Sequence, residues 1–145
     1  MPQSEITAEK ILESLKEGKT IREIINLYPS LNESAVKSVI EWELKQILDE
    51  VTEALKNLYQ NNLVEIILYG SYARRDYDEH SDIDLLVVLN EIKSVGEEID
   101  KMVNAIYDIN LKYNTLVSVV PISYKNYKKI NSPLLLNVRK EGIKI

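Results

Sequence analysis

The chain has 145 residues, 45% of them hydrophobic and 28% charged, which suits one domain or a minimal domain with a short attachment and excludes a collagenous or largely disordered protein. The chain has 18 lysines and arginines and 23 aspartates and glutamates. The resulting formal charge of −5 argues against a protein whose whole surface binds nucleic acid. The absence of cysteine excludes disulfides, thiolate zinc sites and cysteine nucleophiles, and the single histidine, His80, excludes a multi-histidine metal site.

The first part of the chain has the periodicity of helices, because apolar residues recur three and four positions apart. Thr20 and Glu23 have the spacing of a capping box, and Asn32 can cap a further helix. A longer apolar stripe then runs on to Leu58. We therefore predict a small all-helical N-terminal domain over residues 1–42.

After this helical part, the period changes to that of strands. We predict strands over residues 63–69, 83–89 and 115–120, with Pro121 closing the last one, and helices over about 94–112 and 132–140. The second strand is nearly all apolar, as expected when both faces of a sheet are covered. On the helix from 94, we expect the core side to consist of Val95, Ile99, Met102, Val103, Ile106 and Ile109. This order of elements indicates the α/β class.

Two short motifs flank the loop between the first two strands. Gly70-Ser71 ends the first strand, and Asp82-Ile83-Asp84 opens the second after ten intervening residues. A glycine lets the backbone approach a ligand closely, and a serine near a helix start offers a hydroxyl and an amide, so the first motif suits a phosphate. The two carboxylates alternate to one face of a strand and suit an oxygen-preferring cation such as Mg²⁺, bridged to nucleotide phosphates.

This spacing resembles the signature of the minimal nucleotidyltransferases of the DNA polymerase β superfamily. The resemblance covers about residues 43–145 and implies a nucleotidyltransferase core, with a short mixed sheet flanked by helices. It implies Asp82 and Asp84 as catalytic residues that bind Mg²⁺. The nucleotide-binding residues that it implies are Gly70 and Ser71, and we expect the charges of Arg74 and Arg75 to meet the triphosphate as well.

The chain departs from that signature at two positions. The family carries a third carboxylate on a later strand, and the position most like it is Ser118. Either catalysis is slow, or a base such as Glu91 or Glu141 replaces the missing carboxylate, or activity is lost. The second departure is Arg75, where similar sequences usually have glycine.

Other charged residues admit a less specific interpretation. Arg74 can equally serve as an ion-pair partner within its own loop, and we expect His80 to be exposed without a role. Residues 112–145 carry 7 basic and 1 acidic side chains, so the tail is the one basic region. Its cations either form a solvated face or contact a nucleotide or acidic partner: Lys125, Lys128, Lys129, Arg139 and Lys140.

Residues 4–42 resemble a helix-turn-helix-like domain of bacterial and archaeal antitoxin-type proteins, through the run Leu15–Ile25 and the following Tyr28–Leu31. Between Asn32 and Trp42 only one residue is basic, which argues against DNA binding by a monomer and favours dimerisation or partner docking. We expect Trp42 to lie in a core between the two domains.

Together these resemblances imply an enzyme that transfers AMP from Mg²⁺-ATP to a hydroxyl of a protein, as the antitoxin of a helical, ribonuclease-type toxin encoded nearby and modified on tyrosine. The alternative is a weak or inactive module that neutralises a toxin by contact or regulates DNA. A small-molecule transferase of the aminoglycoside type is a third option. No apolar run approaches the roughly 18 residues of a membrane span, and the N-terminus lacks the order of a signal peptide, so we expect a cytoplasmic protein without a membrane partner.

Overall fold

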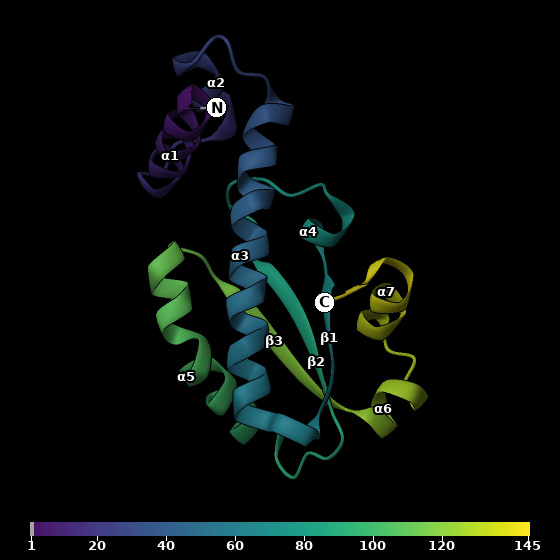
Figure 1. The fold of residues 1–145 in the computed structure, drawn as a ribbon. Coiled ribbons are helices and arrows are strands. Elements are labelled where there is room, and N and C mark those ends of the chain that lie inside the picture. The colour runs from purple at the N-terminus through teal and green to yellow at the C-terminus, as the bar shows by residue number, and fades with distance from the viewer. Residues whose placement is uncertain (1) are drawn as a thin grey trace. The chain divides into compact units, whose positions relative to one another are not determined.

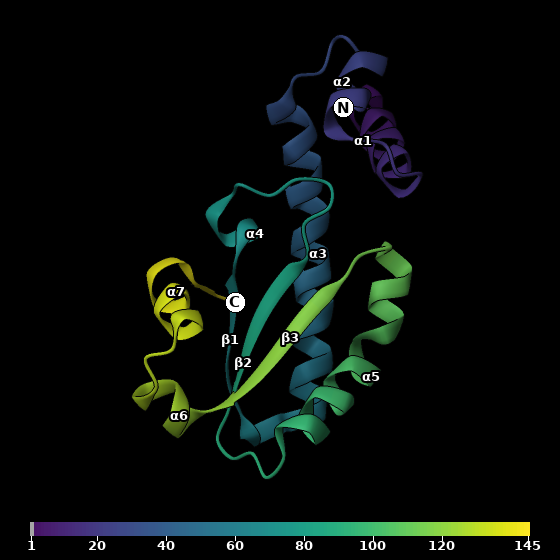
Figure 2. The same ribbon diagram turned by 180° about the vertical axis from the view of Figure 1, so that it is seen from behind.

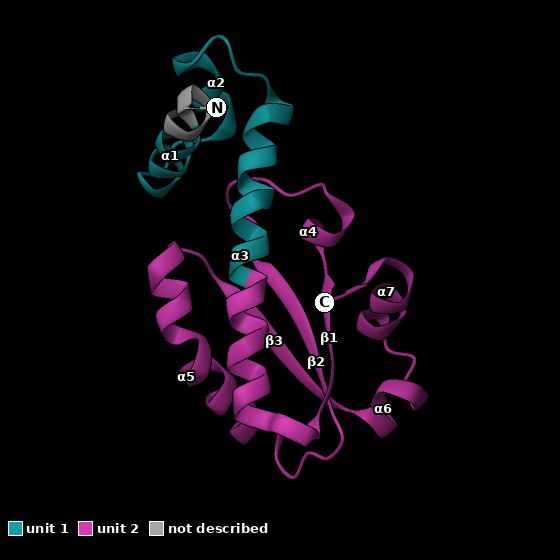
Figure 3. Cartoon of the chain, in the orientation of Figure 1, with its two compact units in different colours: residues 1–47 teal, residues 48–145 magenta. Residues whose placement is uncertain are grey.

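The computed structural model describes residues 2–145, with side chains from Ala8 onward. The chain forms two compact units, residues 1–47 and 48–145 (Figure 3). The division falls inside helix α3 (Glu33–Tyr59), and so does the boundary predicted after residue 42. No helix in the described part of the chain is long and apolar enough to cross a membrane.

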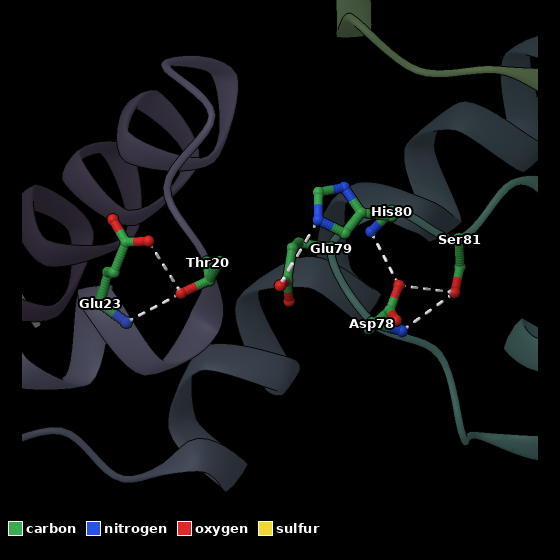
Figure 4. Close-up of polar contacts among 6 residues, drawn as sticks. All are labelled: Thr20, Glu23, Asp78, Glu79, His80 and Ser81. Atoms are coloured by element: carbon green, nitrogen blue, oxygen red, sulfur yellow. Dashed lines mark hydrogen bonds and ion pairs between the residues drawn. The ribbon is translucent and has the colours of Figure 1, made fainter.

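Unit 1 consists of α1 (Pro2–Lys16), α2 (Ile21–Leu27) and the first half of α3. The predicted capping box is confirmed, since the Thr20 hydroxyl accepts a hydrogen bond from the Glu23 amide at 3.1 Å (Figure 4). Asn32 likewise accepts from an amide in the first turn of α3. The buried core of this unit is Ile11, Ile21, Ile24 and Val36. Trp42, on α3, is 59% exposed.

Unit 2 begins with the second half of α3 and is built around one mixed sheet (Figure 1). The strands lie in the order β3-β2-β1-β4, with β1 antiparallel to both of its neighbours and β2 parallel to β3. The predicted α/β class, with a short mixed sheet flanked by helices, is confirmed. The remaining elements, in chain order, are η1 (Gln60–Asn62), β1 (Leu63–Tyr69), α4 (Ser71–Arg74), β2 (Ile83–Leu89), α5 (Val95–Tyr113), β3 (Val117–Ser123), α6 (Tyr124–Lys129), α7 (Pro133–Glu141) and β4 (Ile143–Lys144).

The central strand β2 is covered on both faces, as its apolar sequence predicts. On one face, Leu86 and Val88 pack with Leu135 and Val138 of α7. The second half of α3 and α5 lie over the other face (Figures 1 and 2). Because side chains alternate along a strand, Asp84 projects from the same face as Leu86 and Val88, the face on which α7 packs.

Strand β3 continues beyond its expected end. We expected Pro121 to close it, but the strand extends to Ser123 and pairs with β2 along its whole length. Only one side of β3 is paired, because it is the edge of the sheet. A proline whose nitrogen faces away from the neighbouring strand removes no hydrogen bond from the ladder.

Helix α5 buries a narrower stripe than its sequence suggests. Met102 and Ile106 are fully buried, whereas Val95, Ile99 and Val103 are exposed, so their assignment to the core is wrong. A helix that lies along the edge strand β3 contacts the sheet through residues four positions apart, here Met102 and Ile106. The residue that follows each contact position, such as Val103 after Met102, is turned away from the sheet. Part of the apolar surface of α5 is therefore exposed.

Candidate functional site

The two predicted motifs meet where β1 ends. Gly70 has φ 79° and ψ −157°, a conformation almost restricted to glycine, and it forms the N-cap of α4. Its neighbour Tyr69 pairs with Asp84 across the antiparallel strands. A Cβ placed on Gly70 would lie 2.4 Å from the Oδ2 atom of Asp84. The backbone of the turn is thus in direct contact with the carboxylate, and a side chain at position 70 would separate them.

Asp82 and Asp84 stand at the start of β2. The strand itself begins at Ile83, as predicted, so Asp82 is the last residue of the preceding loop. Burial raises the pKa of Asp84 above its ordinary value, the charge of Asp82 raises it further, and Arg74 opposes both effects. A carboxylate pair whose charges repel each other at the end of a sheet is a setting that favours a cation.

Ser118 occupies the place beside this pair. It is the partner of Asp84 in the parallel register of β2 and β3, so both side chains project from the same face. Strand β3 therefore presents a hydroxyl beside Asp84. Among the described residues there is no group of three or more acidic, histidine or cysteine side chains that could hold a metal. Of the alternative bases, Glu91 follows the opposite end of β2, and Glu141 is paired with Arg74.

The two arginines after Ala73 differ in their surroundings. Arg74 donates from Nε to Asp76 at 3.0 Å and from Nη1 to Glu141 at 2.9 Å. Arg75 is exposed and has φ 65°, in the left-handed region, at the C-cap of α4. Glycine adopts this region without strain, so an arginine at this position carries a backbone cost.

Local contacts hold the loop between the motifs in one conformation. Asp78 Oδ1 accepts from the His80 amide at 2.8 Å, and the Asp78 amide donates to Ser81 Oγ at 2.9 Å (Figure 4). The imidazole of His80 is 78% exposed, as predicted, and its Nε2 atom lies 3.9 Å from the Glu79 carboxylate. The buried ring of Tyr77 stacks on Tyr72, with centroids 4.5 Å apart.

Most of the basic tail lies away from this site. The three lysines of α6 are exposed and follow the end of β3 that is distant from Ser118. Arg139 donates to the backbone carbonyls of Tyr127 and Ile130 and to the side chain of Asn131. That arginine therefore stabilises the connection between α6 and α7. The position of the α6 lysines matches the solvated face that we considered for them.

The donor set fits Mg²⁺. This ion is commonly bound by one or two carboxylates together with substrate phosphates and waters, and Asp82 and Asp84 provide the carboxylates. Gly70 leaves the space beside Asp84 Oδ2 that a Cβ would fill. The turn that follows, at Ser71, provides a hydroxyl and amides for phosphate oxygens.

Comparison with known proteins agrees with this geometry. The sequence profile of the nucleotidyltransferase domain matches residues 48–144, and that of a protein of unknown function (DUF433) matches residues 2–42. Two proteins of Methanocaldococcus jannaschii, each named "Putative protein adenylyltransferase", are 34% and 36% identical to the chain. The alignments cover 71% and 68% of this chain and 99% and 93% of those relatives.

Solved structures resemble the chain more distantly. A chain of the toxin–antitoxin complex MntA–HpeT is 18% identical in sequence to this chain, with a TM-score of 0.49. The match covers 67% of this chain and 69% of the chain in the complex. A "putative nucleotidyltransferase" of Sulfolobus solfataricus is 24% identical with a TM-score of 0.45, over 70% of this chain and 74% of that one. The sequence profile carries the assignment, since it matches more than half of the chain and includes Gly70, Ser71, Asp82 and Asp84. The chain belongs to the nucleotidyltransferase domain family.

Proposed function

We propose that this nucleotidyltransferase transfers AMP from Mg²⁺-ATP to a hydroxyl group of a protein. The observation that carries the proposal is the contact between the Gly70 backbone and the Asp84 carboxylate, which brings a phosphate-binding turn and a metal-binding pair to one place. The choice of AMP and of a protein acceptor is supported by relatives named as protein adenylyltransferases, one of which aligns over 99% of its length.

In this proposal each residue of the site has a separate task. Asp82 and Asp84 hold the metal ion, while Gly70 and Ser71 bind the β and γ phosphates through amides and the Ser71 hydroxyl. Arg75 offers a further positive charge to the triphosphate. When bound, Mg²⁺ supplies neutralisation of the charge that develops on the phosphate oxygens.

The reaction is an in-line displacement. The acceptor oxygen forms a bond to the α phosphorus, the bond from that phosphorus to the bridging oxygen of the β phosphate breaks, and pyrophosphate leaves. The hydroxyl proton passes to solvent, since Ser118 in place of a third carboxylate provides no strong base. We therefore expect a slower reaction than a site with three carboxylates would give.

The acceptor that we propose is a helical, ribonuclease-type toxin encoded beside this protein and modified on a tyrosine hydroxyl. The proposal extends the sequence resemblance to antitoxin-type minimal nucleotidyltransferases. It is supported by the small size of unit 2, which at residues 48–145 has little material for a small-molecule acceptor pocket.

Labelling tests the proposal directly. The protein is incubated with Mg²⁺, ATP labelled on the α phosphate and the product of the adjacent gene. The matched control is the Asp82→Asn, Asp84→Asn variant, which keeps the shape of both side chains but removes their charge. We expect label on the neighbour with the native chain and none with the variant. No label, together with no measurable binding of Mg²⁺-ATP, would refute the enzyme function.

Ser118 favours a second candidate function, a nucleotidyltransferase fold that neutralises its partner by binding alone. In that case the neighbouring protein co-purifies with the chain and loses activity in the complex, without label and without added ATP. The Asp82→Asn, Asp84→Asn variant then neutralises the partner as well as the native chain does.

A further inference from the structure

Arg74 connects the phosphate-binding turn to the C-terminal helix. Its backbone amide donates to the carbonyl of Gly70 at 3.0 Å, so Arg74 belongs to the turn itself. Its guanidinium donates to Glu141, which is 67 positions further along the chain at the end of α7. The same guanidinium also bonds Asp76, whose amide donates to the carbonyl of Ser71 at 3.1 Å. Arg74 therefore contacts both ends of α4: its backbone amide bonds Gly70 before the helix, and its guanidinium bonds Asp76 after it.

Glu141 is a firm anchor for this contact. A Cβ on the adjacent Gly142 would lie 2.4 Å from the carbonyl oxygen of Val138 and 2.7 Å from Cγ2 of Ile67. The C-terminal segment is thus packed directly against β1. The short strand β4 then pairs with β1 at Ile67 and Leu68, immediately before the turn. These contacts fix Glu141 relative to the strand that ends at Gly70.

The charges favour keeping Arg74 where it is. The side chain of Glu141 is 15% exposed, whereas that of Arg74 is 47% exposed. If Arg74 turned toward a phosphate, the poorly solvated carboxylate of Glu141 would lose its cation. The free energy lost at Glu141 would be larger than the free energy that the exposed guanidinium of Arg74 gains from hydration. A phosphate would also have to compete with two carboxylates for one guanidinium.

We propose that Arg74 is a positioning residue, whose ion pair with Glu141 holds α4 so that Gly70 and Ser71 face the nucleotide phosphates beside Asp84. Arg74 does not contact the nucleotide, and the end of α7 sets the affinity for ATP from outside the site. The inference rests on the proposed function in one respect, namely that the ligand of the turn is ATP.

The decisive variant is Glu141→Gln, because the two possible roles of Arg74 predict opposite results for it. If Arg74 positions the turn, loss of the Glu141 charge loosens α4 and weakens binding. If Arg74 contacts the triphosphate, the same change releases the guanidinium and leaves binding equal or tighter. Glutamine keeps the size and the acceptor oxygen of Glu141, so the fold is preserved.

Binding of a non-hydrolysable ATP analogue with Mg²⁺, measured by titration calorimetry, provides the readout. We expect the Kd to rise about 3- to 10-fold for Glu141→Gln and for Arg74→Gln, with no further rise in the double variant, because both changes break one contact. The matched control is Glu53→Gln, the same change at an exposed position on α3 for which no ion pair is recorded among the described residues, and its Kd should equal that of the native chain. Faster amide exchange at residues 71–76 in both single variants, with unchanged unfolding temperature, shows that the effect is local.

Unchanged or tighter binding in Glu141→Gln overturns the inference, and so do additive effects in the double variant. These outcomes are distinguishable from failure of the proposed function, in which the native chain itself does not bind the analogue.

Discussion

Replacement of Gly70 with alanine tests the geometry on which the site depends. The native φ of 79° and ψ of −157° lie in a region that costs a residue with a side chain roughly 1–3 kcal/mol. The added Cβ would also stand 2.4 Å from Oδ2 of Asp84, so the carboxylate must move. If backbone strain and the steric conflict together cost about 2 kcal/mol, the unfolding temperature of a domain of the size of unit 2 falls by roughly 8–16 °C. We also expect binding of Mg²⁺-ATP to be lost.

Two comparisons separate the causes. Gly96→Ala is the matched control, because a Cβ on this helical glycine meets nothing within 4 Å, and we expect equal or slightly higher stability. In an Asp84→Ala background the steric conflict disappears but the backbone strain remains, so Gly70→Ala should cost less there than in the native chain. Thermal unfolding of the five proteins, namely the native chain, the three single variants and the double variant, measures both differences. If Gly70→Ala costs the same in the two backgrounds, the contact with Asp84 that we describe is refuted.

Three further variants test other parts of the description. Ser118→Asp adds a carboxylate beside Asp84, so we expect faster AMP transfer, by about tenfold or more as is typical of an added general base, and no gain from the matched Ser118→Asn. Arg75→Gly relieves a left-handed backbone and should raise the free energy of unfolding by about 1 kcal/mol while weakening ATP binding; lower stability in urea denaturation would contradict the strain argument. Burial raises the pKa of Glu43, and the charge of Lys16 opposes this rise. Because the folded pKa of Glu43 lies above its unfolded pKa, the contribution of Glu43 to the free energy of unfolding is fully present below the unfolded pKa and is lost as pH rises through the folded pKa. Glu43→Gln should therefore be more stable than the native chain at pH 7 and no different at pH 3, and a constant difference across this range would contradict the assignment.

The sequence predicted those features that depend on local pattern. The strands over 63–69 and 83–89 have the predicted bounds, because their apolar runs end at glycine or acidic residues. A motif with fixed spacing across a single loop was therefore enough to identify the candidate site.

Features that depend on contacts between distant segments were not predictable in this way. Arg74 and Glu141 are both charged residues at helix ends, and nothing in the local sequence of either one indicates the other. The sequence periodicity of α5 also could not show which of two adjacent apolar stripes would meet the sheet, and Val103 was placed on the wrong one. In both cases the outcome is decided by the arrangement of α5 and α7 against the strands.

Pro121 has a consequence for how this protein can associate with others. The outer edge of β3 has a proline at its centre, which provides no amide hydrogen there for an incoming strand. At the opposite edge, β4 is only two residues long. A strand from another molecule can therefore form few hydrogen bonds with either edge of the sheet. This protects the folded chain from edge-to-edge aggregation. Helices and loops are therefore the surfaces with which interface mapping should begin.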